Sequence, residues 1–373
     1  MDAKSFLEAL ATGKITRRDT LKAMSAVGLV NLALPTIMRP ARAGGELTVF
    51  TWSGYELPEF YPAYVEKYGA APAFSFYADN DEAFQKVNAG YRPDLVCPSN
   101  PLVKKFHDAG IIRPIDTSRL SNWPDMLEGL KTVDGTVFGD QTWYVPWDWG
   151  TSSIVYRPDL VDPEYIETNS WKILWDERYA GRLATNDQMD SIVIPAALVL
   201  GIENPFAMSD EEIAEVKEFL VQQRPLLRFY WQSETDVAQA MAAGEVVAAY
   251  GWNSTAAALK AHGVPTGYMV PIEGILTWTD GYCLVEGSEG DEQAAYDFLD
   301  AVISVEAGVH LVNTFGFGAA NGKSFELVDQ DVLDGLGIAN PEEALATGIY
   351  FETIESPWRE KYLNMVDEVR AGA

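Results

Sequence analysis

Five tryptophans lie beside polar or acidic residues at apparent strand ends or in loops. They are Trp52, Trp147, Trp149, Trp252 and Trp278. The face of an indole ring attracts cations through its quadrupole, and a neighbouring carboxylate adds full charge and hydrogen-bond acceptors. Any one of these tryptophans taken alone is better explained as a large core residue, so the prediction depends on the set. Together they favour a box of aromatic walls and acidic ends that would hold an ammonium ligand.

Two aspartates lie next to these tryptophans. Asp148 separates two of them in the sequence, and Asp280 follows Trp278 by two residues. Residues two apart in a strand point to the same face, so Trp278 could stack on an alkyl-ammonium while Asp280 accepts its N–H protons. The alternative for Asp280 is structural, namely that it begins a turn with Gly281 and caps the local backbone. We expect both carboxylates to contact the ligand.

A second acidic pair, Asp187 and Asp190, is three residues apart at the predicted N-terminus of a helix. Asp187 could be an N-cap there, and Asp190 a first-turn acid favoured by the helix dipole. The functional alternative, which is compatible with the first, is a pair of anionic acceptors facing a cleft. Paired carboxylates with tryptophans also describe glycoside hydrolases, where one acid protonates the leaving oxygen and another acts as base or nucleophile. An exported glycosidase therefore remains an alternative at this point.

Other enzyme and metal chemistries find no support in the sequence. It contains no G-x-S-x-G, H-E-x-x-H, GxxxxGK[ST] or G-x-G-x-x-G motif. His107, His262 and His310 are scattered, and two cysteines make neither a zinc cluster nor a disulfide scaffold. We therefore expect no catalytic residue, no metal and no cofactor. Cys97 and Cys283 lie in apolar strands, which suits buried free thiols, although export to an oxidising compartment would also permit a disulfide.

The composition excludes one large class of partners. The chain has 55 acidic and 27 basic residues, a formal net charge of -28 and a pI near 4.3. This is the opposite of what a binder of the phosphate backbone needs, so we expect no nucleic acid. The charge favours cationic ligands only weakly, because it also keeps an exported protein soluble. With 373 residues, 47% of them hydrophobic, the chain can form one large or two medium domains.

The candidate residues are placed by alternating strands and helices. We predict strands over 46–52, 73–77 and 94–97 and helices over 57–68 and 81–88, which indicates a mostly parallel α/β sheet. Ligands bind beyond the carboxyl ends of such strands, which here are followed by Trp52, Ser53, Tyr55 and Ser99. A second α/β unit follows Pro146, with strands over 152–156, 246–250 and 282–285. Its helices are predicted over 171–177, 210–222 and 291–303, with an apolar stretch over 192–200.

The N-terminal segment indicates export. Arg17 and Arg18 precede the uncharged stretch 23–38, and Ala41-Arg42-Ala43 matches an A-x-A cleavage site. The stretch is shorter than the roughly 20 residues that a membrane-spanning helix needs. The arginine pair resembles the twin-arginine translocation signal, although Thr20 occupies the position of the common Phe. We expect residues 1–43 to be a signal peptide of this type and the mature protein to be periplasmic.

Seven short segments, taken in order, resemble the spermidine/putrescine-binding periplasmic proteins of polyamine ABC transporters. They are Phe50-Thr51-Trp52-Ser53-Gly54-Tyr55, Asp94-Leu95-Val96-Cys97-Pro98-Ser99, Tyr144-Val145-Pro146-Trp147-Asp148-Trp149-Gly150, Ser170-Trp171-Lys172-Ile173-Leu174-Trp175, Thr185-Asn186-Asp187, Gly251-Trp252-Asn253 and Trp278-Thr279-Asp280. The resemblance covers essentially the whole mature chain. It implies an α/β fold of the type II periplasmic binding-protein kind, with two lobes, each a mixed, mostly parallel sheet flanked by helices.

The resemblance also implies where the lobes divide. Hinge crossovers are expected near 146–151 and 274–280. Lobe 1 would comprise 44–148 and 276–325, and lobe 2 would comprise 149–275 and 326–373 with the C-terminal helices. The chain departs from the family pattern at Gly54, where an acid is common, and at Pro101 and Phe317, where aromatic and tyrosine side chains are usual.

The family's binding residues can be carried over to matching positions. Its aromatic walls fall on Trp52, Tyr55, Trp252 and Trp278, its amine-binding acids on Asp187, Asp190 and Asp280, and a polar contact on Ser99. We add Ser53 and Asp148 from local chemistry, and no catalytic or metal-binding residue. The leading hypothesis is a monomeric receptor that captures a polyamine or related organic cation in an interlobe cleft and presents it to an inner-membrane ABC permease. The alternatives are a receptor for a neutral sugar or another non-amine solute, and an exported glycoside hydrolase.

Overall fold

The computed structural model describes residues 47–372, all within one compact unit, Gly44–Ala373. The expected signal peptide, residues 1–43, lies outside the described residues. Two α/β lobes share one mixed sheet with the strand order β2-β1-β3-β12-β7-β10-β8-β9. The two-lobe α/β architecture predicted from the sequence is therefore present, and two long strands carry the sheet from one lobe into the other.

Lobe 1 is built on three parallel strands in the order β2-β1-β3, with the antiparallel β12 beside β3. Its strands are β1 (Thr48–Trp52), β2 (Ala73–Tyr77), β3 (Leu95–Val96), β4 (Ile112–Arg113), β5 (Val137–Phe138) and β6 (Gln141–Thr142). Its helices are α3 (Pro62–Tyr68), α4 (Asn80–Asn88), α5 (Asn100–Asp108), α6 (Glu128–Lys131), α12 (Glu292–Val302) and α13 (Val305–Phe315). The helix predicted over 57–68 is divided into a 3-10 turn, Pro58–Phe60, and α3. Each piece begins with a proline, whose ring suits a first turn but would interrupt a continuous helix.

Lobe 2 contains the parallel order β10-β8-β9. Its strands are β8 (Leu183–Asn186), β9 (Leu227–Trp231), β10 (Ala248–Trp252) and β11 (Gly267–Tyr268). Its helices are α7 (Pro163–Thr168), α8 (Met189–Leu200), α9 (Asp210–Gln223), α10 (Glu234–Ala242) and α11 (Asn253–Ala261). The helix predicted over 171–177 is a 3-10 segment, Trp171–Trp175.

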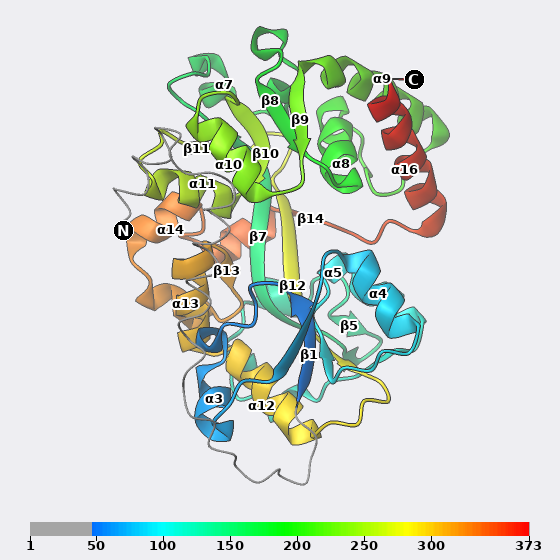
Figure 1. Ribbon diagram of the computed structural model, residues 1–373, viewed down its shortest axis with the longest axis vertical. Coiled ribbons are helices and arrows are strands. Elements are labelled where there is room, and N and C mark those ends of the chain that lie inside the picture. Colours follow the sequence, from blue (N-terminus) through cyan, green and yellow to red (C-terminus); the bar gives the residue numbers. More distant parts are fainter. Residues whose placement is uncertain (1–46, 373) are drawn as a thin grey trace, which may run out of the picture. The chain divides into compact units, whose positions relative to one another are not determined.

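The two crossovers are β7 (Val145–Tyr156) and β12 (Leu276–Val285), which pair antiparallel along most of their length (Figure 1). The predicted crossover segments, 146–151 and 274–280, fall almost entirely within these strands. Asp280 lies directly opposite Asp148, and the register shifts between Asp280 and Gly281. A side chain on Gly281 would meet the Val145 carbonyl oxygen at 2.4 Å, so the close approach of the strands requires glycine there.

The C-terminal segment, expected to belong to lobe 2 from residue 326 onward, packs against both lobes. It contains β13 (Gly318–Ala319), α14 (Gln330–Leu336), α15 (Pro341–Thr347), β14 (Ile349–Tyr350) and α16 (Ser356–Ala371). Leu333 and Leu345, from α14 and α15, belong to the same core cluster as the lobe 1 residues Val49 and Leu95. Val366, from α16, packs instead in the cluster that contains residues of α8 and α9. Leu333 and Leu345 thus pack with lobe 1 residues, whereas Ile349 of β14 packs against the lobe 2 cluster and α16 packs with α8 and α9.

No single helix within residues 47–372 is long and apolar enough to cross a membrane, and only α12 and α13 together, bent by 58° at their junction, reach the required length and composition.

Candidate functional site

Two buried carboxylates face each other where the crossover strands pair. Asp148 on β7 has no exposed surface, and Asp280 on β12 is 7% exposed. The Asp280 backbone N–H donates to Asp148 Oδ1 at 3.2 Å. Like charges directly opposite on antiparallel strands are unfavourable, and burial makes them more so. Within residues 47–372 neither carboxylate forms an ion pair, so their charge has no cationic partner there.

A phenol and a hydroxyl from lobe 1 reach this carboxylate pair. The Tyr55 hydroxyl lies 2.7 Å from Asp148 Oδ2 and 3.0 Å from Asp280 Oδ2. Ser99 Oγ donates to Asp280 Oδ1 at 2.6 Å. Gly54, with φ +105°, turns the chain after β1 into a conformation that L side chains rarely adopt and so directs Tyr55 inward.

The protonation of the carboxylate pair is shifted by its surroundings. Burial, followed by the nearby charge of Asp280, raises the pKa of Asp148 well above its usual value. Burial also raises the pKa of Asp280 to about 6, against the opposing effect of hydrogen bonds from Ser99 and Tyr55. Burial raises the pKa of Tyr55 as well, so its phenol keeps its hydrogen. The site therefore favours a neutralising proton or cation.

Three of the five tryptophans are half-buried and have the edges of other rings against them. Trp52 meets Tyr77 with ring centroids 4.6 Å apart, Trp252 meets Trp231 at 5.1 Å, and Trp278 meets Phe317 at 4.8 Å. The other two, Trp147 and Trp149, are fully buried core residues. The indole N–H of Trp149 donates to the Ala319 carbonyl at 3.0 Å. Both rings pack in the same core cluster as the lobe 1 strands and leave almost no surface for a ligand to contact.

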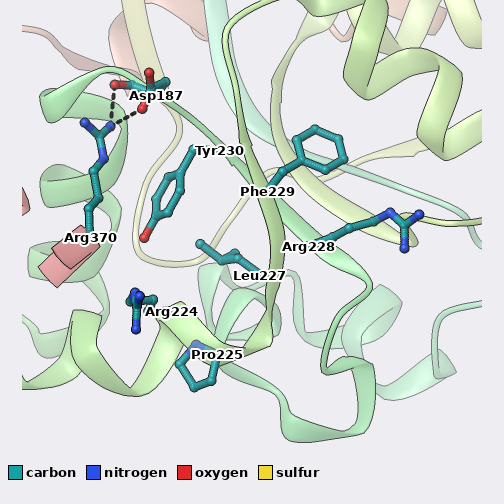
Figure 2. A pocket seen from close by; sticks show the side chains of 8 residues that line it. All are labelled: Asp187, Arg224, Pro225, Leu227, Arg228, Phe229, Tyr230 and Arg370. Atoms are coloured by element: carbon teal, nitrogen blue, oxygen red, sulfur yellow. Dashed lines mark hydrogen bonds and ion pairs between the residues drawn. The ribbon is translucent and has the colours of Figure 1, made fainter. Parts of the chain in front are cut away.

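Asp187 is not brought to the carboxylate pair. Its carboxylate forms an ion pair with Arg370 of α16 (Figure 2). It also accepts a hydrogen bond from Gln232 at 2.6 Å. The adjacent open hollow, of about 400 Å³, is also lined by Arg224 and Arg228. A wall with three arginines repels an ammonium group, so this hollow does not suit a cationic ligand.

The last two predicted residues, Asp190 and Ser53, form no hydrogen bond or ion pair with the carboxylate pair within residues 47–372 either. Asp190 is half-buried in the first turn of α8, where Oδ1 accepts the Ser191 N–H at 2.8 Å. Burial raises the pKa of Asp190, and the charge of Arg359 opposes this. Ser53 is exposed in the turn after β1. Of the ten predicted residues, the structure joins Tyr55, Ser99, Asp148 and Asp280 by hydrogen bonds.

Sequence reasoning missed Asn80, at the start of α4. Its Oδ1 accepts the Ser99 N–H at 3.2 Å, and its Nδ2 donates to Ser99 Oγ at 3.1 Å. Ser99 Oγ thus accepts from Asn80 and donates to Asp280, which fixes the direction of its hydroxyl. The signal was available, because Asn80 closely follows the carboxyl end of the second parallel strand, where ligand-site residues concentrate.

The known proteins that this chain resembles include bacterial solute-binding proteins. A sequence profile of the family described as bacterial extracellular solute-binding protein matches residues 74–332. The putrescine-binding periplasmic protein PotF of Escherichia coli (strain K12) is 23% identical over 336 residues, covering 86% of this chain and 90% of that protein. The spermidine/putrescine-binding periplasmic protein of the same organism is 25% identical over 324 residues, covering 85% and 89%.

Among solved structures, the spermidine/putrescine ABC transporter substrate-binding protein PotD from Streptococcus pneumoniae superposes with a TM-score of 0.74. Its sequence identity is 19%, and the match covers 87% of this chain and 98% of that one. This likeness confirms the predicted type II, two-lobe fold. Together with the curated relatives, it also confirms the resemblance predicted from the seven segments.

Proposed function

Because the chain belongs to the family of bacterial extracellular solute-binding proteins, we propose that it captures a polyamine or a related small organic cation in the periplasm. It would then present this ligand to an inner-membrane ABC permease. The related proteins named above are binding proteins for transport rather than enzymes, and nothing in the site requires turnover. The putrescine and spermidine in the names of the relatives are the first ligands to test.

The observation that carries this proposal is the uncompensated carboxylate pair. Burying a charge without a partner costs several kcal/mol, and a hydrogen-bonded cation offsets that cost. A ligand ammonium at Asp280 would supply the charge that no Lys, Arg or His supplies within residues 47–372. A neutral sugar would leave both acids uncompensated, and an anion would be repelled by them.

The remaining candidates extend the site around this pair. The half-buried rings of Trp52, Trp252 and Trp278 are proposed as walls for the ligand's alkyl chain and ammonium groups. Asp190 is the proposed acceptor for a second cationic end, since it has no ion pair within 4.0 Å among the described residues. Asp187 could join it only if its ion pair with Arg370 were broken.

Thermal shift and calorimetry against putrescine, spermidine, a neutral disaccharide and a dicarboxylate test the proposal. A ligand present at a hundred times its dissociation constant stabilises the folded protein by about 2.7 kcal/mol. We expect at least one amine to raise the melting temperature, and the sugar and the dicarboxylate to leave it unchanged. A response to the sugar or the dicarboxylate alone would contradict the proposal.

Asp280→Asn is the variant that connects this response to the site. A charge-assisted hydrogen bond contributes roughly 1.5 to 3 kcal/mol, so the substitution should weaken amine binding about ten- to a hundredfold. Glu245→Gln is the matched control, because it removes the same charge at an exposed ion pair with Arg228. We expect the control to bind the amine as the unaltered protein does. Equal affinities for all three proteins would remove Asp280 from the site.

A further inference from the structure

The carboxylate pair has more hydrogen-bond contacts than hydrogens to make them. Four contacts reach the four carboxylate oxygens, from the Asp280 N–H, from Ser99 Oγ and twice from the Tyr55 hydroxyl. The backbone amide, the serine and the phenol carry one hydrogen each, and the phenol donates fully to only one carboxylate. The fourth contact, 3.0 Å between the Tyr55 oxygen and Asp280 Oδ2, needs a hydrogen from elsewhere. A protonated carboxyl group in the pair would supply it.

The neighbouring titratable groups offer no positive charge that would make this proton unnecessary. They lie after β1, at the end of β2, after β3, before β7 and on β12, and they are Tyr55, Tyr77, Cys97, Tyr144, Tyr282 and Cys283. Burial raises the pKa of each of them, so all six are neutral at physiological pH. Two carboxylates so close together in such surroundings do not both ionise readily.

We propose that Asp148 and Asp280 hold one proton between them in the unliganded protein, and that the cationic group of the ligand takes its place. Ligand capture would then release a proton from the pair to the solvent. This inference rests on the proposed function and deepens it, because it names how the site is regulated and which chemical group it accepts.

Exposure assigns different roles to the two acids. Asp280 retains a small exposed edge and would contact the cation directly, whereas Asp148 has none. Asp148 is therefore a positioning residue, which acts through the Tyr55 hydroxyl and the Asp280 backbone. The cation that replaces the proton must also replace its hydrogen bond. A primary ammonium or a guanidinium group can do so, whereas a quaternary ammonium group has no N–H to donate.

Calorimetry with putrescine between about pH 5 and pH 8, in pairs of buffers with different ionisation enthalpies, counts the protons released. The amino groups of putrescine stay protonated in this range, as that of a lysine does. The free pair binds its proton more tightly than the liganded pair, so up to one proton should leave per ligand while the free pair is protonated. Affinity should then rise by up to tenfold per pH unit and level off once the free pair is ionised. Binding with no proton release and an affinity independent of pH would overturn the inference and leave the proposed function intact.

Asp148→Asn provides the variant test. The amide would accept the Asp280 N–H through its oxygen and donate to the Tyr55 oxygen through its nitrogen, which completes the network without a shared proton. We expect proton release and the pH slope to disappear in this variant and to persist in Glu245→Gln. Unchanged proton release in Asp148→Asn would overturn the inference.

An infrared measurement on the unliganded protein, with labelled aspartate, separates the inference from the proposed function. We expect a protonated carboxyl signal at about pH 6 that Asp148→Asn abolishes. The absence of this signal from the unaltered protein would overturn the inference. If no amine bound at any pH, the proposed function would fail, and this measurement would still decide whether the pair holds a proton.

Discussion

Replacing Asp148 by asparagine should make the unliganded protein more stable, although it removes a hydrogen-bonded side chain from the interior. The substitution removes one of two facing buried charges and keeps the shape of the side chain. It also supplies the hydrogen that the contact between Tyr55 and Asp280 lacks. Replacing a buried charge usually destabilises a protein because a partner is left unpaired, but Asp148 has no ionic partner to leave.

The magnitude follows from the shifted ionisation of the pair. The rise of the Asp280 pKa from 3.8 to about 6 corresponds to roughly 3 kcal/mol, at 1.36 kcal/mol per unit. Burial causes that shift, whereas the charge of Asp280 adds to burial in raising the pKa of Asp148. Removing the charge of Asp148 therefore recovers part of the cost, and we expect a gain of about 1 to 3 kcal/mol. For about 330 residues the entropy of unfolding is near 0.7 kcal/mol/K, which makes the rise in melting temperature about 1 to 4 °C.

The gain should depend on pH with a definite sign. A carboxyl whose pKa is raised by folding costs nothing below its unfolded pKa, and its cost grows as pH rises toward the folded value. The variant and the unaltered protein should therefore be equally stable near pH 4, and the variant should be more stable at pH 8. Thermal unfolding without ligand, measured at both pH values, checks this.

Asp94→Asn is the matched control for buried acids. Asp94 is buried like Asp148, but its oxygens accept hydrogen bonds from Thr48 N, Thr48 Oγ1 and Gly290 N at 2.8 to 2.9 Å. An amide there would point N–H toward N–H, so this variant should lose stability. If Asp148→Asn lost stability at pH 8 as Asp94→Asn does, the carboxylate pair would neither lack a hydrogen nor suffer the expected repulsion.

Three further predictions concern the surroundings of the site. Asp187→Asn should change putrescine affinity by less than about twofold in calorimetry, because Arg370 already neutralises that carboxylate; a tenfold loss would return Asp187 to the site. Gly281→Ala should destabilise the protein by about 1 to 3 kcal/mol and so lower its melting temperature, since the added methyl group would meet the Val145 carbonyl oxygen at 2.4 Å. An unchanged melting temperature would contradict the close approach of the two strands. Titration of the unfolded protein without reductant should find two thiols, because Cys97 and Cys283 are free and pack in different core clusters; finding none would demonstrate a disulfide.

Sequence reasoning predicted the elements whose signals are local. The strand over 73–77 has the predicted bounds, because alternating side chains and turn residues define it. The helix over 57–68 was predicted as one piece although Pro62, the signal for its division, lies inside it. The lobe assignment of α14 and α15 could not be read in this way, because an apolar helix face does not identify the surface that will cover it.

The candidate site shows the same limit at the level of single residues. Asp148 and Asp280 were identified one by one, but 132 residues separate them, and their meeting depends on the register of β7 and β12. Asp187 was given a ligand role on its local sequence and on the family resemblance, whereas its partner Arg370 lies 183 residues away. Such pairings are properties of tertiary structure, and only the short spacing of Trp278 and Asp280 was visible in advance.

We propose that the carboxylate pair lowers the stability of the unliganded protein and that this cost is a source of selectivity. A ligand without charge gains contacts with the aromatic walls but leaves the two acids as they were, still sharing a proton or repelling each other. A cation with N–H donors would remove the repulsion and complete the hydrogen bonds. It would thereby restore the stability that the two buried carboxylates cost the folded protein. The difference in binding free energy between the charged and the neutral ligand therefore includes the whole electrostatic cost of the empty site. Asp148→Asn, which lowers that cost, should accordingly reduce the discrimination between putrescine and neutral ligands while it stabilises the fold.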